Sequence, residues 1–173
     1  MTTVIIIIAA LFALPFIIAL FVKKEYTAER TIVINKPKHE VFDYIKYIKN
    51  QDKYSKWSMM DPNLKKEFTG VDGTEGFIYA WEGTKAGIGE QEIKSIAEGE
   101  RLTTELRFEK PFKSVGHVYM ITEALTEHST KMIWGLYGSN PYPRNIMNLF
   151  IGGLLGKDLD TSLNNLKKIL EEN

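Results

Sequence analysis

Residues 89–112 decide the fold of this chain, and they read Gly89-Glu-Gln-Glu-Ile-Lys-Ser-Ile-Ala-Glu-Gly-Glu-Arg-Leu-Thr-Thr-Glu-Leu-Arg-Phe-Glu-Lys-Pro-Phe112. The segment predicts two strands joined by a tight turn at Glu98-Gly99-Glu100. In the second strand, one face carries Leu102, Thr104, Leu106 and Phe108, and the other carries Thr103, Glu105, Arg107 and Glu109. This alternation predicts a sheet with one buried face and one face in solvent. The element that covers the buried face then decides the function.

The rest of the chain predicts more short strands and a closing helix. Strands are expected at residues 29–34, 66–69, 76–82, 88–96, 101–109, 114–124 and 131–137, and the short turns between them favour antiparallel pairing. Apolar residues at helical spacing predict a helix over residues 39–48, and a second short helix is expected over 52–57.

A long amphipathic helix is expected over residues 144–171, with an apolar stripe of Ile146, Leu149, Phe150, Gly153, Leu159, Leu163, Leu166 and Leu170. Its glycines, at 152, 153 and 156, are expected to permit a bend or a close approach to the sheet. The order of elements predicts an α+β helix-grip fold. In this fold a curved antiparallel sheet is closed by one long C-terminal helix, and the two enclose a cavity.

The composition excludes several classes of function. A formal net charge of +0 argues against nucleic acid as a partner, because phosphate binding needs a basic excess or a basic face. The chain has no cysteine, which excludes disulfides and thiolate chemistry. His39, His117 and His128 are scattered without metal-ligand spacing, so no metal site and no cofactor are expected.

The N-terminus carries an uncharged apolar run from Val4 to Val22. As a helix rising about 1.5 Å per residue, it would be roughly 28 Å long, close to the hydrocarbon thickness of a bilayer. A cleaved signal peptide is the alternative, but no basic residue precedes the run and no small-residue cleavage site follows it. We therefore expect a single-pass transmembrane anchor over residues 1–24 and a separate domain over 25–173. Lys23 and Lys24 favour a cytoplasmic domain by the positive-inside rule.

An ordered set of short motifs resembles the START-related SRPBCC superfamily, and most closely its bacterial polyketide cyclase/dehydrase branch. The set spans about Tyr26 to Leu170 and consists of Asn35–Phe42, Tyr54–Ser58, Asp61-Pro62, Tyr79–Trp81, Gly89–Ile93, Glu105–Phe112, Thr130–Gly135, Asn140–Pro143, Leu155–Asp158 and Leu163–Leu166. The sequence departs from the family pattern at Ile151-Gly152-Gly153-Leu154. The resemblance implies a pocket between sheet and helix for a hydrophobic or amphipathic small molecule. It implies no particular reaction, because many members bind or carry ligands and few cyclise or hydrolyse them.

Alternation along the strands gives the candidate ligand-binding residues. They share an aromatic or Met-rich character with a few polar atoms, as small-molecule pockets do, and the alternative is that they simply fill a core. The set is Trp57, Tyr79, Trp81, Gln91, Thr104, Leu106, Phe108, Met120, Trp134, Met147, Phe150 and Leu154. A buried tryptophan needs a partner for its indole N–H, and Gln91, Thr104 or a ligand could supply one.

No catalytic residue is assigned. Glu90 and Glu92 share a face, as paired carboxylates for acid–base chemistry must, but alternation places that face in solvent. Glu105 and Arg107 are expected to form a solvated charge pair, and His117 alternates with Val118 and should point outward.

Three functions remain open. The first is a membrane-anchored domain that binds a lipid, quinone or isoprenoid in the sheet–helix cavity. The second is a cyclase, dehydratase or hydrolase, which needs an acid or base facing that cavity. The third is a regulatory or structural module, which a filled interior without a pocket of about 300 Å³ or more would favour.

Overall fold

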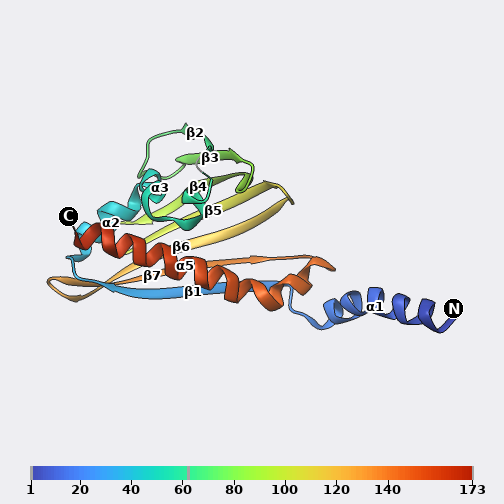
Figure 1. Ribbon diagram of the computed structural model, residues 1–173. Coiled ribbons are helices and arrows are strands. Elements are labelled where there is room, and N and C mark those ends of the chain that lie inside the picture. Colours follow the sequence, from blue (N-terminus) through green and yellow to red (C-terminus); the bar gives the residue numbers. More distant parts are fainter. Residues whose placement is uncertain (1, 62, 173) are drawn as a thin grey trace.

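The structure, a computed structural model, describes residues 2–61 and 63–172, so Pro62 of the Asp61-Pro62 motif lies outside it. Figure 1 shows a curved sheet crossed by one long helix, with a further helix extending from one end. The elements are α1 (Thr2–Phe21), β1 (Glu25–Ile34), α2 (Lys38–Lys46), η1 (Ile48–Asn50), α3 (Gln51–Tyr54), α4 (Lys56–Met59), β2 (Lys65–Thr69), β3 (Ile78–Gly83), β4 (Gly87–Ala97), β5 (Arg101–Lys110), β6 (Ser114–Thr126), β7 (Ser129–Ser139), η2 (Arg144–Met147) and α5 (Asn148–Glu171).

The strands form a 7-stranded antiparallel sheet in the order β1-β7-β6-β5-β4-β3-β2. From β2 to β7, strands adjacent in the sequence are adjacent in the sheet, as the short turns predicted. The first strand begins at Glu25, four residues before the predicted start at 29, and pairs with β7 along its whole length. The predicted α+β helix-grip fold is confirmed.

Strand β5 has the two faces that its alternation predicted. Leu102 and Thr104 are buried on the concave side, whereas Glu105 and Arg107 are partly exposed on the other. Across the ladder, Glu92 lies opposite Glu105 and Glu90 lies opposite Arg107, so the charged residues of two strands gather on the convex face. Such cross-strand neighbours are close enough to pair.

Helix α5 closes the concave face with its C-terminal two-thirds. Leu159, Leu163 and Leu166 are fully buried in a core shared with the sheet and with Phe42 and Ile45 of α2. Gly156 lies against the Arg30 side chain of β1, because a Cβ at this position would overlap the Arg30 guanidinium. The predicted close approach to the sheet is therefore confirmed at this glycine.

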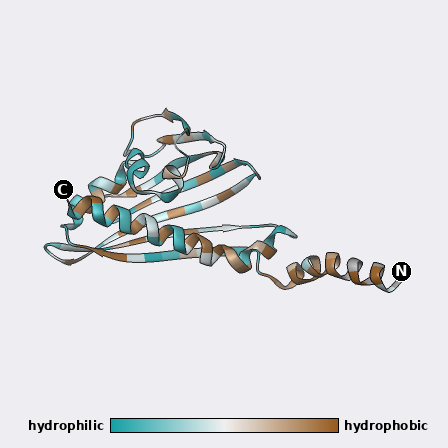
Figure 2. Cartoon of the chain, in the orientation of Figure 1, coloured by the Kyte–Doolittle hydropathy of each residue, from teal (hydrophilic) through white to brown (hydrophobic). Residues whose placement is uncertain are grey.

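The end of η2 and the first turns of α5 are exposed where the prediction placed them in the interior. Met147, Phe150 and Leu154 are 50%, 67% and 64% exposed, although we expected them to face the interior. At about 100° per residue, positions 150 and 154 lie more than a quarter turn away from Leu155 and Leu159, which do face the sheet. Figure 2 shows hydrophobic colouring on this part of α5 and on α1.

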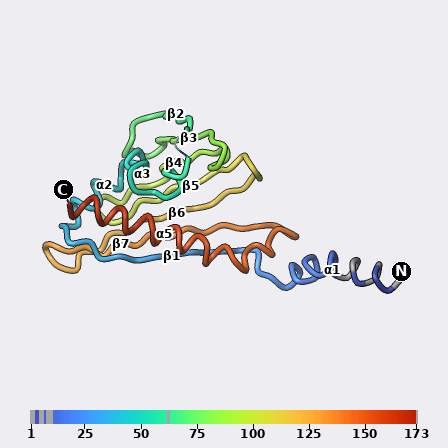
Figure 3. Tube along the Cα trace, viewed as in Figure 1, coloured from blue at the N-terminus to red at the C-terminus, as the bar shows by residue number. Residues whose placement is uncertain are grey.

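Helix α1 extends from the end of the sheet where β1 starts and α5 begins, while the C-terminus lies at the opposite end (Figure 3). Among the residues that the structure describes, no helix reaches the length and apolarity of a membrane span. The single-pass span predicted over Val4–Val22 is therefore not confirmed.

Candidate functional site

A cavity of about 270 Å³ lies between the concave face of the sheet, the short helices α3 and α4, and Leu155 of α5. It is partly open to solvent, and its wall is mostly apolar. The lining residues are Ile48, Gln51, Ser55, Trp57, Ser58, Met60, Leu64, Tyr79, Trp81, Lys85, Ala86, Gln91, Leu106, Phe108, Val118, Trp134, Leu136 and Leu155. This volume is below about 300 Å³, the lower end of the range for small-molecule sites, so size alone favours the regulatory or structural alternative. The interior is nonetheless hollow and open on one side, which a filled core would not be.

The structure brings together seven residues of the predicted set, six from the sheet and one, Trp57, from α4. Trp57, Tyr79, Trp81, Gln91, Leu106, Phe108 and Trp134 all line the cavity. Thr104 and Met120 are not in the lining: Thr104 stands behind Gln91, and Met120 is buried in the core. Met147, Phe150 and Leu154 lie on the exterior of η2 and α5 and do not line the cavity.

Several lining residues were missed. Gln51, Ser55, Ser58 and Met60 come from or follow α3 and α4, which are 4 residues each. One helical turn has no periodicity from which an inward face can be recognised. Leu155 was also missed, because we predicted that the adjacent residue Leu154 would face the cavity.

Aromatic rings form much of the cavity wall. Trp57 and Trp134 meet edge to face with ring centroids 6.1 Å apart, and Trp81 meets Phe108 in the same way at 5.7 Å. The chain has 3 tryptophans, and all of them line this cavity. Intrinsic tryptophan fluorescence therefore reports on the contents of the cavity, and Trp57 and Trp134 report on it without also lining a second hollow, as Trp81 does.

The polar atoms of the wall fall into two groups. Trp81 donates its indole N–H to the carbonyl of Ala86 at 3.3 Å, and Gln91 Nε2 donates to Thr104 Oγ1 at 2.9 Å. Trp134 Nε1 and Gln51 Nε2, in contrast, are buried and have no acceptor among the described residues. An unpaired buried donor costs about 1–3 kcal/mol. Both donor atoms are covered by neighbouring protein atoms, so an acceptor reaches them only when those neighbours move.

Tyr79 fastens the sheet wall to α3. Its hydroxyl donates to Asp52 Oδ1 at 2.7 Å, and Lys66 Nζ lies 2.8 Å from the other carboxylate oxygen. Burial first, and then the hydrogen bond to Asp52, raises the pKa of Tyr79 well above its ordinary value of 10.0. The phenol therefore stays protonated and serves as a structural donor.

Asp61 holds the β3–β4 turn at the rim of the cavity. Its Oδ2 accepts the backbone N–H of Lys85 at 2.9 Å, and both Lys85 and Ala86 line the cavity. The hydrogen bond from Lys85, together with others from this turn, lowers the pKa of Asp61 below its ordinary value of 3.8. The carboxylate stays ionised and keeps the turn in place.

The carboxylates considered for acid–base chemistry lie on the convex face, as expected. Arg107 contacts Glu90, Glu92 and Glu105, each at 2.6 Å. Hydrogen bonds to Glu90 and then Glu92 raise the pKa of Arg107, and the one from Arg107 is the largest cause that lowers the pKa of Glu92. His117 stacks on Tyr137 on the same face, with ring centroids 5.0 Å apart.

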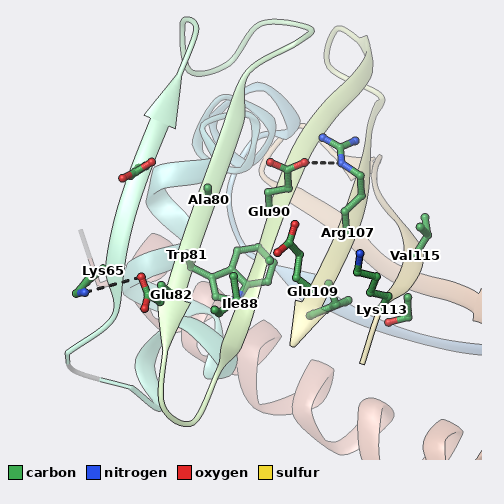
Figure 4. A pocket seen from close by; sticks show the side chains of 14 residues that line it. Lys65, Ala80, Trp81, Glu82, Ile88, Glu90, Arg107, Glu109, Lys113 and Val115 are labelled. Atoms are coloured by element: carbon green, nitrogen blue, oxygen red, sulfur yellow. Dashed lines mark hydrogen bonds and ion pairs between the residues drawn. The ribbon is translucent and has the colours of Figure 1, made fainter. Parts of the chain in front are cut away.

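A second hollow, of about 540 Å³, lies over the edge of this convex face. Figure 4 shows its mixed charges, with Lys65 paired to Glu82 and Arg107 to Glu90. Its charged groups largely neutralise one another, which distinguishes it from the apolar inner cavity. Within residues 2–61 and 63–172, no group of three or more His, Asp or Glu residues is arranged to hold a metal ion.

Comparison with known proteins agrees with this geometry. Residues 25–171 match the profile of a family described as polyketide cyclase / dehydrase and lipid transport. The chain belongs to this family. The match begins where β1 begins and ends at the last residue of α5, so it covers the whole helix-grip unit. A comparison with curated proteins found no match.

Solved structures share the fold at low sequence identity. The crystal structure of Ara h 8.0201 is 13% identical with a TM-score of 0.57, over 86% of this chain and 99% of that one. A protein from Mesorhizobium loti is 13% identical with a TM-score of 0.62, over 85% and 98%. A hypothetical protein from Helicobacter pylori is 10% identical with a TM-score of 0.64, over 83% and 86%. At these identities the likeness establishes the fold alone.

Proposed function

We propose that the domain binds a hydrophobic or amphipathic small molecule, such as a lipid, quinone or isoprenoid, in the sheet–helix cavity. The observation that supports the proposal is an apolar cavity lined by all 3 tryptophans, in whose wall two buried donors have no acceptor among the described residues. The family to which the chain belongs, described as including lipid transport, supports the same class of ligand.

The chemistry of the wall narrows the ligand further. Its body is apolar, because aromatic and aliphatic side chains make most of the contact surface. In our proposal it carries an acceptor oxygen that reaches the N–H of Trp134 or Gln51 when the side chains covering them move, because neither donor has an acceptor among the described residues. With about 270 Å³ enclosed, the ligand is small or extends through the open side.

A fluorescence titration tests this proposal. The full chain is titrated with a fatty acid, a quinone and an isoprenoid alcohol while tryptophan emission and thermal stability are followed. We expect a saturable change in emission and a raised melting temperature with at least one class. The matched variants are Val118→Phe/Leu155→Phe, which fills the cavity, and Leu125→Phe, which changes an exposed residue of β6. Binding that survives filling of the cavity would contradict the proposal.

We further propose that α1 holds the domain at a bilayer, with the domain on the cytoplasmic side. Residues 2–21 contain no charged residue, and Phe12, Leu20 and Phe21 are 74%, 68% and 85% exposed. Exposed apolar surface of this extent marks a contact with a membrane or another protein. Flotation of the full chain with lipid vesicles tests the association, and protease accessibility in host membrane vesicles tests the side. A chain that stays at the bottom of the gradient would refute the association.

The enzyme alternative depended on an acid or base facing the cavity. Glu90, Glu92 and His117 lie on the convex face instead, so their positions do not favour a reaction inside the cavity.

A further inference from the structure

A group of exposed apolar side chains surrounds the point where α1 joins the domain. We call it the junction surface, and its members lie in the β5–β6 connection, in η2 with the residues before it, and in the first turns of α5. They are Phe112, Tyr142, Met147, Leu149, Phe150 and Leu154, each 46–67% exposed. Large apolar residues gathered in this way on one end of a domain are typical of an interaction surface.

Side-chain contacts bring these segments together. The guanidinium of Arg144 in η2 lies 5.5 Å from the ring centroid of Phe112. Asn140 Nδ2 donates to Asn148 Oδ1 at 2.8 Å, and the backbone N–H of Asn140 donates to the carbonyl of Lys24 at 2.9 Å. The β5–β6 connection, η2 and the start of α5 therefore lie at one end of the sheet, the end at which α1 leaves it (Figure 1).

The joint between α1 and this surface is fixed by hydrogen bonds. Asn145 Nδ2 donates to the carbonyls of Ala19 and Val22 at 2.6 and 2.7 Å. Asn148 Nδ2 donates to the carbonyls of Lys23 and Lys24 at 2.9 and 2.7 Å. Asn145 satisfies carbonyls at the C-terminal end of α1, which a helix leaves without partners, and Asn148 holds the link between α1 and β1. These hydrogen bonds therefore fix the orientation of α1 relative to the junction surface.

The charge at this end is basic. Segments 22–25, 109–115 and 139–150 contain Lys23, Lys24, Lys110, Lys113 and Arg144, against the acidic residues Glu25 and Glu109. None of these five cations forms an ion pair within the part of the chain that the structure describes. Basic residues beside apolar and aromatic ones match the head-group region of a membrane that contains anionic lipids.

We infer that the junction surface is a second membrane contact. It lies in the interface of a bilayer that contains anionic lipid, and it sets the orientation of the domain relative to the membrane. This inference rests on the proposed association of α1 with a membrane. A lipid surface fits better than a second protein, because the junction surface continues the exposed apolar residues of α1 through a fixed joint and carries unpaired cations beside them. Leu154 of this surface neighbours Leu155 of the cavity wall, so the contact sets the cavity close to the membrane.

Single-cysteine labelling tests the inference, because the natural chain has no cysteine. Full-length Phe112→Cys, Phe150→Cys and Leu154→Cys are labelled with a polarity-sensitive fluorophore and added to vesicles of phosphatidylcholine and phosphatidylglycerol. Some of the phosphatidylcholine carries a nitroxide quencher near the glycerol backbone. Leu125→Cys is the matched control, since Leu125 is comparably exposed but lies near the β6–β7 turn, at the opposite end of the sheet.

We expect quenching at positions 112, 150 and 154 to exceed that at 125 several-fold. Vesicles that bind the chain without quenching these positions would overturn the inference while leaving the role of α1 intact. Shielded emission that appears without lipid and rises with protein concentration would instead assign the surface to a second copy. A chain that does not bind vesicles would refute both membrane proposals, whereas the tryptophan titration of the cavity is independent of all three outcomes.

Discussion

Gln51 and Gln91 both line the cavity and are similarly buried, yet within the described residues only the side-chain N–H of Gln91 has an acceptor. Gln91 Nε2 donates to Thr104 Oγ1 at 2.9 Å, whereas Gln51 Nε2 has no acceptor among the described residues. The two amides are 7% and 6% exposed, so their difference is one of partners and not of solvent contact. In our proposal, the hydrogen bond from Gln91 to Thr104 stabilises the cavity wall, and the Gln51 side chain binds the ligand.

Replacing each glutamine with the apolar methionine separates these roles. Gln51→Met removes an unsatisfied buried donor, so the free energy of unfolding without ligand should rise by about 1 kcal/mol. Ligand affinity should fall several-fold in the same variant. Gln91→Met should lower the free energy of unfolding by about 1 kcal/mol, since it deprives Thr104 of its partner. Urea unfolding and the tryptophan titration measure both quantities. A Gln51→Met protein that is less stable and binds normally would mean that Gln51 is structural.

The glycines of α5 provide a second matched pair. A Cβ at Gly153 meets no atom of the described residues within 4 Å, so Gly153→Ala should stabilise the protein by up to about 1 kcal/mol through helix propensity. Gly156→Ala should show no such gain, because its Cβ displaces the Arg30 guanidinium that pairs with Asp160 at 3.0 Å.

Adding Arg30→Ala to both variants supplies the control for the glycine pair. In the Arg30→Ala background, Gly156→Ala should also raise the free energy of unfolding. The stabilisation by Gly153→Ala should be the same as in the wild-type background. Equal effects of the two alanines in the wild-type background would argue against the close approach of α5 to β1.

The convex charge cluster predicts a dependence of stability on pH. The pKa of Glu92 is lowered in the folded state, chiefly by Arg107, so its contribution to stability is present above its ordinary pKa of 4.5 and is lost as the pH falls through the lowered folded value. Arg107→Met should therefore flatten the loss of stability below about pH 4.5. The change at neutral pH should be modest, below about 1 kcal/mol per pair, because these side chains are partly exposed.

Glu123→Gln is the control for the charge cluster, since Glu123 forms one exposed pair with Lys131 at 3.0 Å. Its acid unfolding curve, followed by circular dichroism, should match that of the wild type more closely than the Arg107→Met curve does. Identical curves for the wild type and Arg107→Met would show that the cluster contributes nothing to acid stability.

The sheet was predictable from the sequence because a period of two identifies both faces of a strand. Trp81, Gln91 and Phe108 were therefore placed correctly. On the helical side Trp57 was predicted, but Gln51 and Met60 were missed, because α3 and α4 are single turns and show no period. At Phe150 and Leu154, apolar character was taken for burial, but apolar residues also mark an exposed contact surface. The unpaired donor of Trp134 depends on packing between distant segments, which no local pattern reveals.

The most direct test of the central claim is native mass spectrometry of the full chain, purified from its own host without detergent and compared with Val118→Phe/Leu155→Phe. We predict that the wild-type protein carries an apolar molecule of defined mass with at least one oxygen acceptor, and that the filled variant lacks it. A wild-type chain consistently free of ligand, or the same adduct on both proteins, would contradict the account.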